Sequence, residues 1–133
     1  MTKLYHASPT KFRDSIRKTG LKANNGRCGI AVYMVFCPEQ AHKIGLWHCD
    51  NEDQMYEFDI WSVDIDQKKH KLHVETHPGW CKMTPFKEVM VPESLTGPNQ
   101  LKLEEDLETD MHFDDLKAFA LKNSLGNIEH LFL

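Results

Sequence analysis

The chain lacks the signals of a secreted or membrane protein. Its opening, MTKLYHASPT, has no apolar stretch behind the lysine. The longest nearly unbroken apolar run, GIAVYMVF, is far shorter than the ~20 residues that a membrane-spanning helix needs. We therefore expect a cytoplasmic protein with no membrane partner. The four cysteines are then expected to be reduced, because disulfides persist in oxidising compartments.

The sequence also lacks the short motifs of common nucleotide, metal and thiol sites. It has neither G-x-G-x-x-G nor G-x-x-x-x-G-K, so we expect no doubly wound or P-loop nucleotide site. No two cysteines form C-x-x-C, and the spaced series His73, His77 and Cys81 is interrupted by Pro78 and Gly79. We expect no metal site. No cysteine has the sequence context of a catalytic nucleophile.

What is present is the composition of a folded protein with an uneven charge. The 133 residues are 41% hydrophobic and 27% charged, which is typical of one globular domain. The net charge of −4 is unevenly spread, since residues 1–27 carry seven basic side chains and one acidic, whereas residues 99–133 carry eight acidic and three basic. Solvated faces explain this most simply, although a basic first quarter also attracts phosphates or acidic partners.

Local patterns predict an α+β fold of short strands and small helices. Alternating apolar and branched residues predict strands at residues 3–8, 30–37, 55–66, 71–75 and 86–91. Helical spacing predicts one short helix that ends at Gly20, a second from Pro38 to Gly45, and one or two amphipathic helices from Leu101 onward. We expect a single domain over residues 1–133, with a core at about 4–98 and a C-terminal helical extension at about 99–133.

Four of these segments, taken in order, resemble one enzyme family. The segments are LYHAS, SIRKTGL, GIAVYMVFCPEQAHKIG and KEVMVP. They are similar to the H-G-[ST] strand, the I-x-x-x-G-L helix end, the G-x-Y-F strand with its helix, and the late glutamate strand of the H-Y-E class of ADP-ribosyltransferases. The resemblance runs from about residue 4 to about residue 98. It implies a split mixed β-sheet whose crevice binds NAD, and transfer of ADP-ribose to a macromolecule.

The resemblance implies a role for each matching residue. His6 would hydrogen-bond a ribose of NAD, the backbone of Ala7 would hold the nicotinamide amide, and Ser8 would add a contact to the same ribose. Tyr33 would stack on the nicotinamide ring. Glu88 would accept a hydrogen bond from the other ribose and face the positive charge that grows on that sugar as nicotinamide leaves.

Two departures bear on substrates. The family has glycine where this chain has Ala7, so the amide pocket would be narrower. Phe86 stands two residues before Glu88, where relatives that modify arginine carry glutamate or glutamine, so an arginine acceptor is disfavoured. The loop before Glu88 lies where relatives grip their targets, and Trp80, Lys82 and Phe86 are its candidate acceptor contacts.

Other readings of the same residues stay open. Taken singly, His6 and Tyr33 suit core packing, and Glu88 suits a solvated strand. The leading interpretation is an NAD-dependent mono-ADP-ribosyltransferase that acts on a protein side chain, with a nucleic-acid acceptor as another option. The alternative from a different class is a catalytically silent module that binds a protein or nucleic acid. An RNA 2′-phosphotransferase-like enzyme or an NAD glycohydrolase ranks lower.

Overall fold

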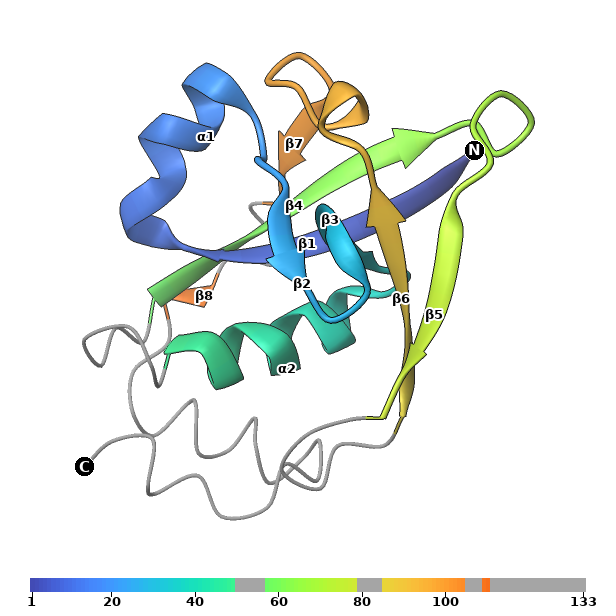
Figure 1. Ribbon diagram of the computed structural model, residues 1–133. Coiled ribbons are helices and arrows are strands. Elements are labelled where there is room, and N and C mark those ends of the chain that lie inside the picture. The colour runs from blue at the N-terminus through green and yellow to red at the C-terminus, as the bar shows by residue number, and fades with distance from the viewer. Residues whose placement is uncertain (50–56, 79–84, 105–108, 111–133) are drawn as a thin grey trace.

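The computed structural model describes residues 1–49, 57–78, 85–104 and 109–110, which form an α+β fold (Figure 1). In chain order the elements are β1 (Thr2–Pro9), η1 (Thr10–Phe12), α1 (Arg13–Thr19), β2 (Asn24–Gly26), β3 (Gly29–Val35), α2 (Pro38–Cys49), β4 (Glu57–Ile65), β5 (His73–His77), β6 (Phe86–Val91), η2 (Glu93–Leu95), β7 (Leu101–Leu103) and β8 (Thr109–Asp110). Within these residues no helix is long and apolar enough to cross a bilayer.

The strands form one sheet in the order β5-β6-β3-β1-β4-β7, with β2 paired to β3 and β8 paired to β4. Each pairing made by the described residues is antiparallel. The α+β prediction is therefore confirmed, but the expectation of a mixed sheet is wrong for these strands. Even neighbours that are far apart in the sequence, such as β1 and β4, are joined by connections that return the chain antiparallel.

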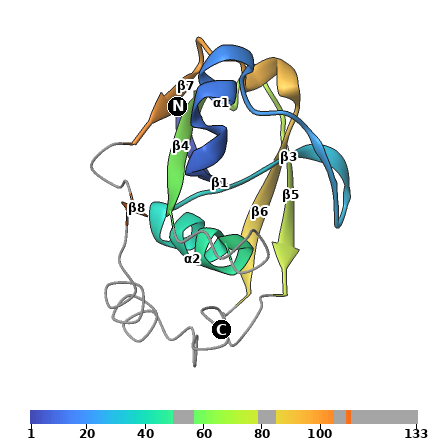
Figure 2. The same ribbon diagram turned by 90° about the vertical axis from the view of Figure 1, so that its left-hand side faces the viewer.

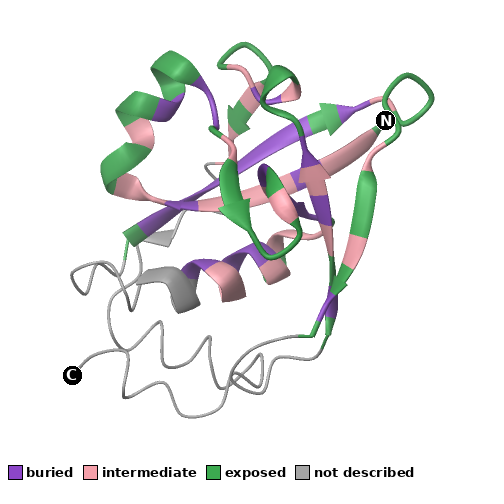
Figure 3. Ribbon diagram, viewed as in Figure 1, coloured by how far each residue is buried: buried purple, intermediate pink, exposed green. Residues whose placement is uncertain are grey.

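The two longer helices pack on opposite faces of the sheet. Ile16 of α1 belongs to a buried cluster with Trp61 and Val63 of β4, whereas α2 packs against Phe58. Residues 58 and 61 differ in parity, so their side chains lie on opposite faces of a strand. Figures 1 and 2 show β1 running between the two helices. Strand β4 is consequently buried from Phe58 to Val63, as the colours of Figure 3 show.

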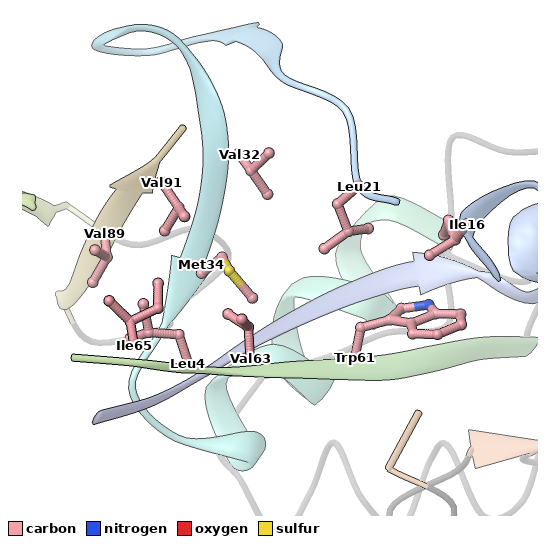
Figure 4. Close-up of a cluster of buried hydrophobic side chains, with 10 residues drawn as sticks. All are labelled: Leu4, Ile16, Leu21, Val32, Met34, Trp61, Val63, Ile65, Val89 and Val91. Carbon is pink, nitrogen blue, oxygen red and sulfur yellow. The ribbon is translucent and has the colours of Figure 1, made fainter. Parts of the chain in front are cut away.

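The core on the α1 face is a continuous apolar cluster (Figure 4). Met34 is fully buried near its centre. The members, each buried, are Leu4, Ile16, Leu21, Val32, Met34, Trp61, Val63, Ile65, Val89 and Val91. They come from α1, the segment after it and four strands, so this cluster joins segments from both ends of the described chain.

Gly20 ends α1 as the sequence predicts. Its φ of +81° lies in the region that favours glycine, and its amide donates to the carbonyl of Ile16 at 2.8 Å. A Cβ at this position would also lie 2.4 Å from the carbonyl oxygen of Thr96. The close approach lets the next residue, Leu21, donate its amide to that same oxygen at 3.0 Å and bury its side chain in the core.

The predicted end of the second helix at Gly45 is wrong, because α2 continues to Cys49. Gly45 does not end the helix but allows it to pack closely against β4. A Cβ at residue 45 would lie 2.5 Å from ring carbons of Phe58, so the absence of a side chain lets the helix rest directly on β4. Sequence alone cannot separate these two uses of glycine, since both place it among helix formers.

The predicted helical extension is also wrong where the structure describes it. Leu101–Leu103 forms β7, which pairs with Trp61–Val63, and Thr109–Asp110 forms β8. Leu101 and Leu103 alternate around Lys102, and the edge of β4 offers backbone partners to this two-residue period. Residues 105–108 and 111–133 lie outside the described residues, and so does the rest of the predicted extension.

The buried carboxylate of Asp59 on β4 binds residues of η1 and of the start of α1. The sequence pattern places Asp59 on a polar face, yet it is 1% exposed. Its two oxygens accept hydrogen bonds from Nε and Nη2 of Arg13, at 2.9 Å and 2.5 Å, and Thr10 Oγ1 donates to Oδ1 at 3.3 Å. A planar guanidinium matches a carboxylate in this two-bond geometry. The charge can therefore be buried beneath α1.

We predict that Arg13→Met lowers the free energy of unfolding by about 3 kcal/mol, because it leaves the buried Asp59 carboxylate without its counter-charge. Urea denaturation of the full chain at neutral pH measures this. The double variant Arg13→Met/Asp59→Asn should recover a large part of the loss. Equal stability of the single and double variants would show that the ion pair is not the reason for the loss.

Candidate functional site

A small pocket opens where β1, β3 and β6 meet α2. Its volume is about 80 Å³, and its lining residues are Tyr5, His6, Ala7, Tyr33, Val35, Ala41, Ile44 and Glu88. Strands β1, β3 and β6 therefore share one pocket, and His6, Tyr33 and Glu88 lie around it. Tyr5, Ala41 and Ile44 were not identified from the sequence, although Tyr5 adjoins His6 and the other two lie one helical turn apart on α2.

The pocket exists because the ladder between β1 and β3 stops early. Strand β1 pairs with β4 along its full length, from Thr2↔Ile65 to Pro9↔Phe58. With β3 it makes a single described pair, Tyr5↔Val35. If the antiparallel ladder continued, Ala7 would be paired with Tyr33, two residues further along each strand. The two strands separate before that point, so the sheet is split beside Ala7.

The backbone of Ala7 points into this split. The carbonyl of Ile60 accepts a hydrogen bond from the amide of Glu104 at 2.9 Å, so the backbone of Ile60 faces away from β1. Ala7 is the partner of Ile60 in the β1–β4 ladder. In an antiparallel pair of this kind both residues turn their N–H and C=O away from each other. The N–H and C=O of Ala7 therefore point toward β3, on the side where the ladder has ended.

His6 takes the place that Ala7 would have had in the ladder. Its Nδ1 lies 2.8 Å from the carbonyl oxygen of Tyr33. A carbonyl oxygen only accepts, so Nδ1 carries a proton and donates this bond. The bond satisfies the Tyr33 carbonyl that the split would leave without a strand partner. His6 thus stabilises the opening and also lines it.

Tyr33 is held by the hairpin that precedes it. Its hydroxyl donates to the carbonyl of Gly29 at 2.5 Å and accepts from the amide of Cys28 at 3.2 Å. Its ring packs on Gly26, where a Cβ would lie 2.2 Å from Cε2. Tyr33 is half-buried and outside the core cluster, so its side chain anchors the β2–β3 turn and lines the pocket instead of packing in the core.

Glu88 presents a half-buried carboxyl group to the pocket. Burial raises the pKa of this carboxyl above its usual value, and the positive charge of Arg27 lowers it in part. Arg27 reaches over from the β2–β3 turn, where its Nη1 donates to the carbonyl of Thr76 at 3.1 Å. The sequence reading did not single out Arg27, because its position near Glu88 depends on how the hairpin lies over β5.

Two residues assigned from the resemblance do not lie where that assignment needs them. Ser8 is buried, 7% exposed, and does not belong to the pocket lining, which on β1 ends at Ala7. Phe86 was expected to contact an acceptor, but it begins β6, is 3% exposed and stacks on His77 with ring centroids 4.7 Å apart. Burial removes Phe86 from any acceptor surface. Trp80 and Lys82 lie outside the described residues.

Burial also affects His77. It lowers the pKa of this imidazole, and the nearby Arg27 lowers the pKa further. Among the described residues no three histidine, cysteine or acidic side chains gather as they would around a metal ion. Cys28 and Cys37 are free thiols, and Cys81 lies outside the described residues. The pocket is lined by two tyrosines, one histidine, one glutamate and four aliphatic residues.

No protein-family model, curated protein or solved structure matches this chain.

We predict that Gly26→Ala destabilises the protein by about 1–3 kcal/mol, because the new methyl group would displace the Tyr33 ring from the turn. Urea denaturation compares this variant with Tyr33→Ala and with the double variant. In the Tyr33→Ala background the added methyl group should cost almost nothing. A full cost in both backgrounds would mean that the ring does not require Gly26.

We also predict that Glu88→Gln makes the fold more stable near pH 7. The folded-state pKa of Glu88 is raised above the usual 4.5, so the folded chain binds more protons than the unfolded chain between these two values. Stability is therefore lost as the pH rises through that range, and glutamine avoids the loss. The gap between variant and wild type should shrink as the pH falls below about 4.5. Urea denaturation gaps that are equal at pH 4 and pH 7 would contradict this assignment.

Proposed function

We propose that the protein is an NAD-dependent mono-ADP-ribosyltransferase that moves ADP-ribose from NAD to a protein side chain. The observation that carries the proposal is the split between β1 and β3, which gathers His6, Ala7, Tyr33 and Glu88 around one pocket. Four segments that resemble one family in sequence order thereby contribute to one site or to its framework. The ADP-ribosyltransferase fold itself is part of this proposal.

The backbone of Ala7 suits the amide of nicotinamide. A carboxamide has one donor and one acceptor side by side, and the N–H and C=O of a strand residue offer the matching pair. Nicotinamide would bind as a short continuation of the ladder that β3 leaves unfinished. The methyl group of Ala7 narrows this position relative to glycine. We therefore expect weaker binding than a glycine at residue 7 would give.

Tyr33 and His6 suit the parts of NAD next to that amide. The hydroxyl of Tyr33 is bound to the turn, so a ligand would meet the aromatic ring, which favours contact with a flat cationic heterocycle. In a neutral imidazole whose Nδ1 donates to Tyr33, Nε2 is an acceptor, and a ribose hydroxyl is a suitable donor. The remainder of NAD would lie outside the pocket, because 80 Å³ is too small for a dinucleotide.

Glu88 suits the chemical step. Cleavage of the bond between nicotinamide and ribose builds positive charge on the sugar while a neutral group leaves. A carboxylate that faces this charge in a partly desolvated site stabilises the transition state more than the ground state. The raised pKa of Glu88 reflects that desolvation. The step needs the ionised, negatively charged form of this carboxyl.

A silent binding module is the second candidate, and the small volume of the pocket favours it. In that case the same pocket would hold one ring or side chain of a partner, without turnover. The basic first quarter of the chain would then contribute to the partner surface. The two candidates differ in whether nicotinamide is ever released.

We predict that Glu88→Gln slows nicotinamide release about 10²–10³-fold, the effect typical of removing one preorganised electrostatic group. NAD affinity should change little, because glutamine keeps most ground-state contacts. Tyr33→Ala should weaken binding first, and His6→Ala should reduce both binding and turnover. Chromatography measures nicotinamide, calorimetry measures affinity, and circular dichroism confirms folding.

Glu57→Gln is the matched control, since Glu57 is an exposed glutamate on β4. It should keep the wild-type rate. A folded Glu88→Gln protein with full activity would remove Glu88 from the mechanism. A wild-type protein that binds NAD or a macromolecule but never releases nicotinamide would establish the silent module.

A further inference from the structure

A second carboxylate lies beside Glu88 on the neighbouring strand. Glu75 of β5 is directly opposite Glu88 in the β5–β6 ladder, and directly opposed residues share a face with Cβ atoms about 4.5–5.5 Å apart. The same row continues through Glu88↔Val35 and Val35↔Tyr5. Tyr5, Val35 and Glu88 all line the pocket. Glu75 therefore stands at the outer end of a row that begins inside the pocket.

Basic groups accompany this pair of acids. Like charges directly opposite in a sheet are destabilising. Nε2 of His73 bonds the carboxylate of Glu75 along the same face of β5, and Arg27 lies near Glu88 through its bond to Thr76. The side chain of Glu75 is 40% exposed and that of His73 is 62% exposed. A large molecule that approaches the pocket over β5 would thus meet Glu75 before Glu88.

We infer that Glu75 is the general base that activates the acceptor, and that the acceptor is a hydroxyl group of a protein side chain. This inference rests on the proposed function. In the transfer step the bond between nicotinamide nitrogen and ribose C1′ breaks, and nicotinamide leaves with the electron pair. A lone pair of the serine or threonine oxygen forms the new bond to C1′. The hydroxyl proton passes to the carboxylate of Glu75 and from there to solvent.

The surrounding charges favour a hydroxyl over other acceptors. A hydroxyl is neutral and keeps its proton at neutral pH, so a positioned base accelerates its attack. A carboxylate acceptor has no proton to give and would be repelled by Glu75 and Glu88. A guanidinium acceptor would meet the positive charge of Arg27, which is held at the same edge by Thr76. The charges around Glu75 thereby favour a hydroxyl group as the acceptor, in addition to the role of Glu75 as the base.

Competition between two small nucleophiles tests the role of Glu75. The full chain is incubated with NAD, methanol and azide, and mass spectrometry measures methyl ADP-ribose and ADP-ribosyl azide. Methanol must lose a proton when it attacks, whereas azide carries none. We expect Glu75→Gln to lower the ratio of methyl to azide product about 10²-fold. Glu57→Gln should leave the ratio unchanged, and Glu88→Gln should slow both products without changing it.

The product ratio does not depend on which step limits the rate. A failure of the inference about Glu75 can therefore be distinguished from a failure of the proposed function. If wild-type protein releases no nicotinamide and forms neither product, the proposed function fails and this inference falls with it. If both products form and Glu75→Gln keeps the wild-type ratio, the inference about Glu75 is wrong while the proposed function stands.

The acceptor class has its own test with labelled NAD. A serine-containing peptide should be labelled in preference to an arginine-containing peptide, and Glu75→Gln should lower that labelling about 10²-fold. Preferential labelling of the arginine peptide would overturn the hydroxyl assignment. Preferential labelling of an RNA oligonucleotide would overturn the assignment to a protein.

Discussion

The hydrogen bond from His6 to the carbonyl of Tyr33 is the interaction on which the site depends. Strands β1 and β3 could continue their ladder past Tyr5 and Val35, and if they did the pocket would close. His6 supplies the proton that the Tyr33 carbonyl would have received from Ala7. A buried carbonyl without a partner would cost free energy, so this bond lowers the cost of the split. One side chain therefore satisfies a carbonyl that the opening leaves without a strand partner.

The rest of the fold supports that opening from both sides. The eight-residue ladder with β4 fixes β1, and the buried Arg13–Asp59 pair fixes β4 under the first helix. On the other side the β2–β3 turn is tied down by the hydroxyl of Tyr33 and, through Arg27, by β5. The split is thus held between two rigid parts. Glu88 can remain half-buried in it although this raises the pKa of its carboxyl.

Much of the fold could be predicted from the sequence, because strand periodicity and helix ends are local properties. The strands containing His6, Tyr33 and Glu88 follow from alternation, and the end of α1 follows from Gly20. The helical conformation at Gly45 and the strand conformation of Leu101–Leu103 depend on contacts with β4, which is not adjacent to either in the sequence. Such contacts are set by tertiary packing, which local pattern does not report.

The difference between local pattern and tertiary packing also explains which residues of the candidate site could be predicted. Its three central residues were identified because each sits in a local motif. Phe86 and Ser8 were assigned from the resemblance, and burial excludes Phe86 from an acceptor surface while Ser8 lies outside the pocket lining. Arg27 and Glu75 were missed because their nearness to Glu88 follows from the hairpin and the β5–β6 register.

The most direct test of this account follows the backbone amide of Ala7 by nuclear magnetic resonance while nicotinamide is added to isotope-labelled protein. If the ligand continues the unfinished ladder, the amide resonance of Ala7 and the ring resonances of Tyr33 should shift together and saturate. Residues of the groove at the far end of β4, such as Asp64 and His70, should not respond. A saturable response at that groove with an unchanged Ala7 amide would contradict the account.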